Sequence, residues 1–252
     1  RDSTCLSESF FPHSMGSFYE AATEFCGFRP NYDEGKTMGL APFGDPDRFY
    51  PRMSRLVEVD ASGRLRVDTS WFAYQNWGSR RCGAKYLEAF GSPRASGTGP
   101  LQDHHADVAA AAQKVLEERV LEMCRILERR TGADHLVVAG GVALNSVMNG
   151  RILRETRFRD LYVMPAAGDN GTSIGAAYYV HNRIHGSAAR YRHDDPYLGP
   201  AYANEVIEAL LRECKLPYER SRDVCVDTAR MLREGRILSL IHISEPTRLR
   251  RI

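Results

Sequence analysis

The sequence predicts an α/β fold organised around two strand–glycine loop–helix units in its second half. Leu136–Ala139 and Leu161–Met164 are short apolar runs of the kind that forms strands buried on both faces of a parallel sheet. The first run ends in Gly140-Gly141 and the second in a Pro-Ala-Ala-Gly-Asp-Asn-Gly loop, and a helical pattern follows each loop. Loops that follow parallel strands meet at one edge of the sheet, where α/β proteins bind ligands.

These two loops predict a binding site for a nucleotide or a phosphate. Gly140, Gly141 and Gly168 let the backbone approach an anion closely, and the helix after each loop offers free N–H groups. Asp169 is the only acidic residue of the second loop, and an acid beside a phosphate usually binds the cation that the phosphate needs. We therefore expect Asp169 to be a metal ligand. Each loop alone also fits an ordinary turn, so the prediction depends on the two occurring together.

The other elements of the first part of the chain follow from periodicity and turn residues. The residues from Glu34 to Gly44 are expected to form a loop. Gln113 and Glu117 fit the surface of a helix as well as any other role. The aromatic residues between Trp71 and Trp77 fit the core better than a sugar-stacking platform. The predicted regular elements are a helix from Ser17 to Cys26, a hairpin of Leu56–Val59 with Leu65–Val67, a helix from Asp103 to about Arg130 and a helix from Thr172 to Ile184.

A polar stretch from Ser187 to Asp195 predicts a linker to a second unit. This unit is expected to hold two helices, at about Asn204–Cys214 and Val226–Arg233, and a strand at Ile237–Leu240. His181 and His185 have the spacing of a helical metal site, but their place at a helix C-terminus, where the helix dipole favours His, explains them better.

Composition favours a protein of the cytoplasm that binds neither nucleic acid nor membrane. Of the 252 residues, 43% are hydrophobic and 26% are charged, and no apolar run is long enough to cross a bilayer. The net charge of +2 resides entirely in the last fourteen residues, which carry three arginines and one glutamate. No basic patch elsewhere suggests nucleic-acid binding. The six cysteines are scattered without a C-x-x-C pair, as expected for free thiols in a reducing compartment.

Several motifs resemble the carbamoyltransferase family, which includes nodulation-factor and antibiotic O-carbamoyltransferases. The resemblance runs from about Phe11 to about Leu238, and its motifs occur in family order. They are FPHSMGSFYEAATEFCGF at residues 11–28, EGKTMGLAPFG at 34–44, AGGVALN at 139–145, NGRI at 149–152 and PAAGDNGTSIGAA at 165–177.

The resemblance implies a fold and a domain organisation. Residues 1–190 would form the C-terminal lobe of an actin-like ATPase domain (ASKHA, ribonuclease H-like) that lacks its N-terminal part. Residues 191–238 would begin a second, truncated α/β domain that resembles threonylcarbamoyl-adenylate synthases. Residues 239–252 are expected to be a non-native tail, because HISEPTR resembles a translated sequencing adapter and the FGPRALG motif of the family is missing.

The resemblance also implies a reaction. The full enzyme would use ATP and carbamoyl phosphate to form carbamoyl adenylate, and would transfer the carbamoyl group to a hydroxyl of a sugar, an antibiotic or a similar small molecule. A divalent metal, often iron, would help to hold the adenylate, with Asp169 as a ligand. Gly140, Gly141, Asn145 and Gly168 would line the nucleotide pocket.

Three further residues are candidates for the same pocket. Gly16 and Glu20 have the spacing of a glycine and an acid that contact the ribose in the related tRNA threonylcarbamoyltransferases. Lys36, beside a glycine, would reach a phosphate as a point charge. No catalytic residue is predicted, since transfer from an adenylate needs no protein nucleophile.

The expected histidine ligands upstream are missing from the sequence, and one acid holds a catalytic metal poorly. We therefore expect these residues to be inactive by themselves. Three alternatives stay open. They are a tRNA threonylcarbamoyltransferase, a sugar or acetate kinase of the actin-like superfamily, and a nucleotide-binding scaffold without catalytic activity.

Overall fold

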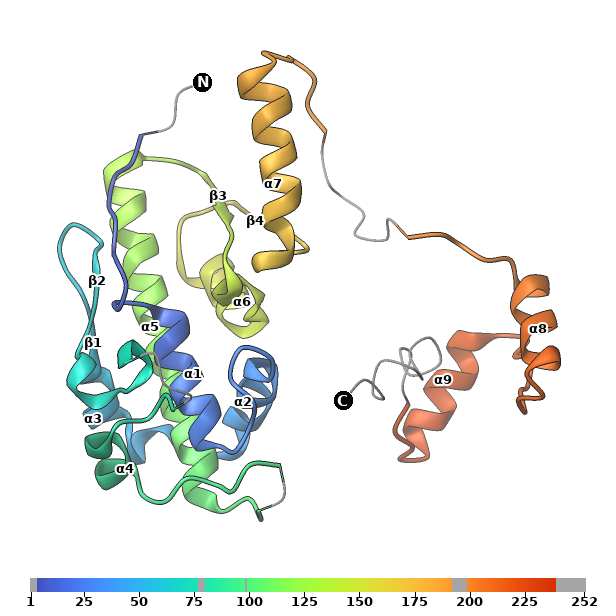
Figure 1. Cartoon of the computed structure of the whole chain (residues 1–252), viewed down its shortest axis with the longest axis horizontal. Coiled ribbons are helices and arrows are strands. Elements are labelled where there is room, and N and C mark those ends of the chain that lie inside the picture. Colours follow the sequence, from blue (N-terminus) through green and yellow to red (C-terminus); the bar gives the residue numbers. More distant parts are fainter. Residues whose placement is uncertain (1–3, 77–79, 98, 192–198, 239–252) are drawn as a thin grey trace. The chain divides into compact units, whose positions relative to one another are not determined.

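The computed structural model describes residues 4–76, 80–97, 99–191 and 199–238, which form a mixed α/β structure of helices and two small sheets (Figure 1). The chain divides into two compact units, Arg1–Pro196 and Tyr197–Ile252. Trp77 and the tail from residue 239 lie outside the described residues, as does the second half of the predicted strand Ile237–Leu240.

The first unit is built around α5 (Asp103–Thr131), the long helix at its centre in Figure 1. Its first half contains four consecutive alanines, Ala109–Ala112, which are all buried, so this part of the helix is covered on every side. Small side chains let neighbouring elements approach the helix closely, and α1 (Met15–Phe25), α2 (Glu34–Leu40) and α3 (Tyr50–Met53) all contact it. The helix ends at Gly132, which has a φ of 62° and forms the left-handed C-cap that the sequence predicts.

An aromatic cluster fills the core between α1, α4 (Ala84–Phe90) and the segment that follows the hairpin. Phe25 packs edge-on against Tyr86, and Phe18 packs edge-on against Phe72. Phe72 and Tyr74 are 3% and 7% exposed. The aromatic residues after Trp71 therefore belong to the core, as the sequence favours, and do not form a sugar-stacking surface.

The predicted loop from Glu34 to Gly44 is wrong, because its first seven residues form α2 and the next three a 3-10 turn, Ala41–Phe43. Two local contacts overcome the low helix propensity of the glycines in this segment. The Glu34 carboxylate accepts a hydrogen bond from the Asn31 N–H at the start of the helix. The Thr37 hydroxyl donates to the Thr23 hydroxyl of α1 at 2.9 Å, and both threonines are fully buried.

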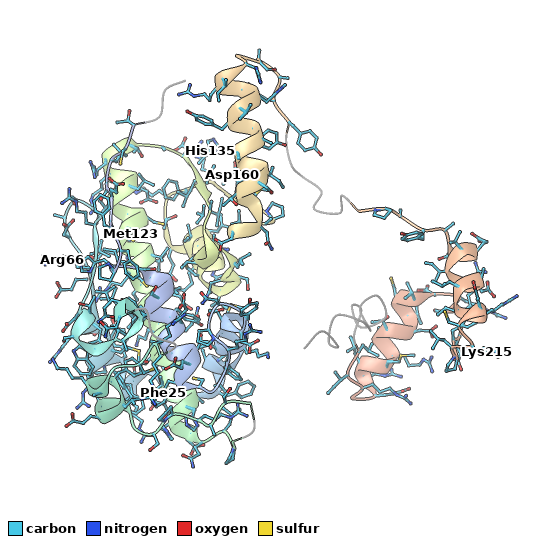
Figure 2. All side chains as sticks on the ribbon, viewed as in Figure 1. Phe25, Arg66, Met123, His135, Asp160 and Lys215 are labelled. Carbon is cyan, nitrogen blue, oxygen red and sulfur yellow. The ribbon has the colours of Figure 1, made fainter. Side chains whose placement is uncertain are left out.

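The two predicted strand pairs are confirmed. β1 (Val57–Val59) pairs antiparallel with β2 (Leu65–Val67), and β3 (His135–Val138) pairs parallel with β4 (Asp160–Val163). The expectation that the parallel strands are buried on both faces is wrong. Leu136 is 9% exposed, whereas Val137 on the other face is 70% exposed. In the described part of the chain the sheet has only two strands, and its open face includes the exposed pair His135–Asp160, which is labelled in Figure 2.

The remaining helices match the predicted pattern closely. α6 (Ser146–Glu155) follows the first glycine loop, and α7 (Thr172–Tyr179) follows the second and continues as one π-helical turn, Val180–Ile184. No residue of α7 is buried. The second unit contains α8 (Asn204–Glu213) and α9 (Val224–Arg233).

Among the described helices, none combines the length and the apolar character that a membrane span requires. All six cysteines lie in described residues and are free, with Cys26, Cys82 and Cys124 buried.

The contact between Gly44 and α5 predicts a strong stability effect. A Cβ on Gly44 would lie 2.1 Å from the carbonyl carbon and oxygen of Ala106, which both belong to a helix backbone that cannot move aside. We expect Gly44→Ala to lower the free energy of unfolding by about 1–3 kcal/mol or more in urea unfolding. Gly39→Ala is the control, because a Cβ there meets nothing within 4 Å, and it should be neutral or stabilising. Equal effects of both substitutions would contradict the close packing.

The N-terminus of α5 predicts a pH dependence of stability. His105 is 3% exposed, and its Nδ1 accepts a hydrogen bond from the Gln102 N–H, which requires the neutral ring. Burial, followed by the nearby positive charge of His104, lowers the pKa of His105 below its ordinary 6.5. The unfolded chain therefore takes up this proton first. The stability that neutral His105 contributes is fully present above pH 6.5 and is lost as the pH falls through the lower folded-state pKa.

Urea unfolding at pH 7.5 and pH 5.5 tests this expectation. The wild type should lose more free energy of unfolding between the two pH values than His105→Gln does. His104→Gln leaves the cap made by His105 in place and removes only the neighbouring ring, so it should keep the part of the pH dependence that comes from the burial of His105. The same pH dependence in the wild type and in His105→Gln would refute the assignment.

Candidate functional site

The two glycine loops lie against each other at the carboxyl ends of β3 and β4, as the sequence predicts. The N–H of Gly140 donates to the carbonyl oxygen of Ala167 at 2.7 Å. A Cβ on Gly168 would lie 3.9 Å from the Cα of Gly141. Gly140 has a φ of 98°, a conformation that residues with a side chain rarely adopt. Glycine is thus required here by the backbone of the turn.

The surface above the first loop is open. A Cβ on Gly140 or on Gly141 would meet nothing within 4 Å, so a ligand can come close to this backbone. Gly141 begins a 3-10 turn, Gly141–Leu144, whose first two N–H groups have no partner among the described residues. An exposed backbone with unpartnered N–H groups has the chemistry that a phosphate requires.

Gly16 lies beside the same loop. A Cβ on Gly16 would lie 3.8 Å from a methyl carbon of Val142. The residue is in the first turn of α1, where Ser14 caps the helix by accepting a hydrogen bond from the Ser17 N–H. The structure therefore brings Gly16, Gly141 and Gly168 into one region, although they lie far apart in the sequence.

Asn145 is at the centre of the site, but its side chain is 9% exposed. Its Oδ1 accepts from the Met148 N–H and so caps α6, and its Nδ2 donates to Oε1 of Gln113. Asn149 holds the same loop from α6, because its Nδ2 donates to the carbonyl oxygen of Ala143 at 2.7 Å. These amides fix the shape of the glycine loop from beneath.

A buried hydrogen-bond network supports the loop from α5. The Tyr19 hydroxyl donates to Oε1 of Gln113 at 2.7 Å, and Nε2 of Gln113 donates to Glu117 at 2.6 Å. Arg151 of α6 then pairs with Glu117 at 2.8 Å. The sequence leaves a surface role open for Gln113 and Glu117, and the structure excludes that role, since they are 6% and 8% exposed. Burial raises the pKa of Tyr19 well above its ordinary value, so its hydroxyl stays protonated and donates.

The Glu20 carboxylate is engaged within the protein. Arg81 donates to it from Nε at 2.8 Å, and the side chains of both residues are about one fifth exposed or less. The Asn31 amide, oriented to donate, lies 2.9 Å from the second carboxylate oxygen of Glu20. The role of Glu20 at a ribose stays a prediction, and in this conformation the residue joins α1 to the segment that holds Arg81.

Lys36 lies on α2 with a largely exposed side chain that pairs with Asp33 at 2.9 Å. The same helix reaches the N-terminus of α6, where the Ser146 hydroxyl lies 3.8 Å from the sulfur of Met38. Because surface ion pairs are weak, Lys36 can exchange Asp33 for a phosphate at little cost.

Asp169 is exposed in the second loop, where it begins the 3-10 turn Asp169–Gly171, and its carboxylate makes no hydrogen bond or ion pair within the described residues. Among those residues, no group of three or more His, Cys, Asp or Glu side chains is placed to bind a metal. His181 and His185 are both exposed on the π-helical turn and just after it. The residues present therefore do not by themselves fit a metal ion, and the metal role of Asp169 stays a prediction.

The buried thiols are poor nucleophiles. Burial raises the pKa of Cys26 to about 12 and the pKa of Cys124 to about 11. Burial likewise raises the pKa of Cys82 far above its ordinary range. All three are therefore protonated at neutral pH, so none of them offers a thiolate to a substrate.

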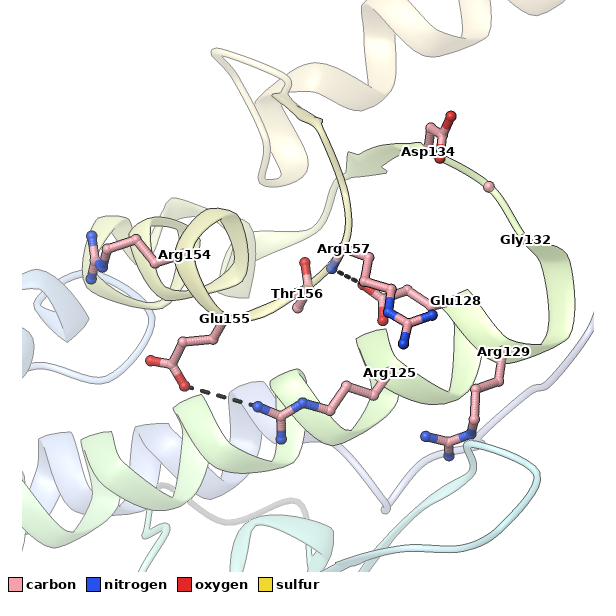
Figure 3. Close-up of a pocket in the computed structure, with 10 residues that line it drawn as sticks. Arg125, Glu128, Arg129, Gly132, Asp134, Arg154, Glu155, Thr156 and Arg157 are labelled. Atoms are coloured by element: carbon pink, nitrogen blue, oxygen red, sulfur yellow. Dashed lines mark hydrogen bonds and ion pairs between the residues drawn. The ribbon is translucent and has the colours of Figure 1, made fainter.

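A cavity of about 640 Å³ lies away from the glycine loops (Figure 3). It is lined by Gly132–Asp134, just before β3, and by residues 154–157, just before β4. It is thus at the amino ends of the strands, whereas the loops follow their carboxyl ends. Arg129 and Arg154 occupy the last turns of α5 and α6, where they favourably meet the helix dipoles, and Arg125 pairs with Glu155 at 3.9 Å. We assign no nucleotide to it.

Comparison with known proteins gives a family match. The family model described as Carbamoyltransferase N-terminus matches residues 2–178. An uncharacterised protein of Synechocystis, sll1178, is 37% identical over 92% of this chain and 39% of its own length. Nodulation protein NolO of Bradyrhizobium diazoefficiens is 34% identical over 92% of this chain and 41% of its own length. Nodulation protein NolNO of Sinorhizobium fredii is 31% identical over 92% of this chain and 33% of its own length. The chain therefore spans about two fifths or less of the length of these relatives.

The two charged candidates should respond differently to removal. Glu20→Ala removes a partly buried carboxylate that accepts a hydrogen bond from Arg81, so we expect the free energy of unfolding to fall by about 1–2 kcal/mol. Lys36→Ala removes only an exposed pair and should change it by less than about 0.5 kcal/mol. Urea unfolding of both variants measures the difference. A negligible effect of Glu20→Ala would mean that the pair with Arg81 contributes nothing to stability.

Proposed function

The chain belongs to the carbamoyltransferase family, and we propose that it forms the nucleotide-holding part of an ATP-dependent O-carbamoyltransferase. The observation that carries this proposal is the contact between the two glycine loops, which are joined by the hydrogen bond from the Gly140 N–H to the Ala167 carbonyl oxygen. Both loops lie within the matched residues. Membership of the family supports a small-molecule acceptor, and we propose by resemblance that the accepting group is a hydroxyl.

In the proposed reaction, ATP, carbamoyl phosphate and water supply a carbamoyl adenylate with release of phosphate and pyrophosphate. An acceptor hydroxyl then attacks its carbamoyl carbon, loses its proton and displaces AMP. A site for this transfer must hold the nucleotide phosphate while its charge increases. Gly141 and Gly168 would approach the phosphate with their backbones, and Gly16 would border it from α1. Lys36 would add a positive charge at the rim.

We further propose that the first unit is the C-terminal lobe of an actin-like ATPase domain and that the second begins an adenylate-synthase-like domain. A parallel strand pair with a glycine loop after each strand supports the first assignment. The metal, iron by resemblance, would stabilise phosphate charge. Asp169 would be one of its ligands, but since the described residues offer no second ligand beside it, we derive no step through the metal. The proposed location is the cytoplasm.

Two assays test the proposed function. The first measures binding of ATP and of a non-hydrolysable ATP analogue to the chain by titration calorimetry. The second supplies ATP, labelled carbamoyl phosphate and a panel of sugar hydroxyls to the chain and to its longer relatives, and detects labelled product. Phosphorylation of an acceptor without carbamoyl phosphate would instead identify a kinase. ATP binding with no transfer by any of these proteins would identify a scaffold.

Gly141→Ala provides a site-specific prediction. A Cβ there meets no protein atom within 4 Å, so the variant should unfold at the same temperature as the wild type. The same Cβ would stand between the backbone and the phosphate, and we expect ATP binding to weaken about tenfold or more, which corresponds to at least about 1.4 kcal/mol.

The matched control is Gly175→Ala on α7, where a Cβ also meets nothing within 4 Å. It should retain wild-type affinity. If Gly141→Ala binds ATP as tightly as the wild type does, the phosphate does not lie on this loop.

A further inference from the structure

Gln113 of α5 makes more side-chain hydrogen bonds than any simple packing role requires. Its Oε1 accepts from the Tyr19 hydroxyl at 2.7 Å and from Nδ2 of Asn145 at 2.9 Å. Its Nε2 donates to Oδ1 of Asn145 at 3.0 Å and to Oε1 of Glu117 at 2.6 Å. A side-chain amide has two acceptor positions and two donor hydrogens. All four are therefore used, and every partner is a buried side chain.

These partners belong to the elements that form the candidate nucleotide site. Tyr19 lies one turn beyond Gly16 on α1, and Asn145 ends the glycine loop and caps α6. Glu117 connects the amide to Arg151 of α6. The site has two sides, α1 and the glycine loop, which meet where Gly16 lies beside the loop. The single side chain of Gln113 forms hydrogen bonds with both sides, with Tyr19 of α1 and with Asn145 of the loop.

Only a glutamine fits this pattern of partners. A glutamate would keep the two acceptor positions but would lose both donors and place a second carboxylate against Glu117. An apolar side chain of similar size would leave the Tyr19 hydroxyl, the Asn145 amide and Glu117 with lost partners in a buried place. Buried networks of this kind are stabilising when complete and costly when one member is lost.

We propose that Gln113 is a positioning residue, which fixes the glycine loop Gly140–Asn145 relative to α1 so that both can hold the nucleotide phosphate. It acts through Tyr19 and Asn145 and does not touch the ligand. This inference rests on the proposed function for its ligand, but the positioning of the loop itself can be measured without any ligand.

Hydrogen exchange of the 252-residue chain is the first measurement. The reporter amides are Gly140, which bonds to Ala167 of the second loop, and Ala143 and Met148, which are bonded within the first loop and its cap. The reference amide is Asp68, which bonds to Leu56 at the remote hairpin. In Gln113→Leu and in Tyr19→Phe, exchange at the reporters should rise about tenfold over the reference, the factor expected for one lost buried hydrogen bond.

Tyr50→Phe is the matched control. The Tyr50 hydroxyl also bonds to a side chain of α5, Glu118, but it does so from α3 and belongs to neither side of the candidate site. This variant should leave the reporter amides unchanged.

Exchanging the amide at position 113 and the carboxylate at position 117 tests the role of the amide itself. Gln113→Glu should raise the exchange of the reporters, because it removes both donor hydrogens. The double variant Q113E/E117Q should partly restore slow exchange, since the amide introduced at position 117 can donate to the carboxylate introduced at position 113. A residue with only a general packing role would show no such rescue.

The outcomes distinguish the positioning role of Gln113 from the proposed nucleotide-binding function. Faster exchange confined to the reporters, together with ATP affinity about tenfold weaker at a temperature far below unfolding, would support the inference. Unchanged exchange, or an equal rise at Asp68, would overturn it. If the wild type binds no ATP while Gln113→Leu still loosens the reporters, the proposed function fails and the positioning of the loop by Gln113 stands.

Discussion

The first unit depends on close approach to one helix, α5. Gly44 comes so near to the N-terminal part of α5 that a single Cβ would collide with the Ala106 backbone. The same helix then places Gln113 and Glu117 beneath the glycine loop. Because α1, α2 and α6 all contact α5, the candidate site residues Gly16, Lys36 and Asn145 share one rigid support. A shift of α5 would move all three sides of the site together.

Two kinds of hydrogen-bonding group have different roles at this site. Buried amides and carboxylates around Gln113 shape the loop from below, where low polarity makes each bond strong and each loss costly. The outer side of the loop backbone at Gly140 and Gly141 is open, and Lys36 of α2 carries an exposed positive charge. A rigid support beneath an open backbone, with a positive charge nearby on α2, suits the binding of an anionic ligand. Neither the cysteines nor the arginine-lined cavity at the amino ends of the strands contributes to it.

The sheet that carries both loops has a covered and an open face. Leu136 packs into the core, while Val137 faces outward and α7 buries none of its residues. Parallel strands are normally covered on both faces. The hydrogen bond between Gly140 and Ala167 and the contact of Gly168 with Gly141 thus hold the loops together even though the described sheet is only two strands wide.

The sequence by itself determined the local elements and the two glycine loops. Hydrophobic periodicity placed the long helix from Asp103 and the two strand pairs, and the glycines at 140 and 168 marked the loops, because these signals depend only on neighbours along the chain. The helix over Glu34–Leu40 escaped prediction, since packing on α5 and the bond between Thr37 and Thr23 outweigh its glycines.

Only the tertiary structure revealed the pairing of Glu20 with Arg81 and the role of Gln113. Arg81 lies 61 residues from Glu20, and Gln113 bonds to Tyr19 and Asn145 across 94 and 32 residues of chain. No local pattern records which distant side chain will complete a buried hydrogen bond, because that choice is made only when the helices pack.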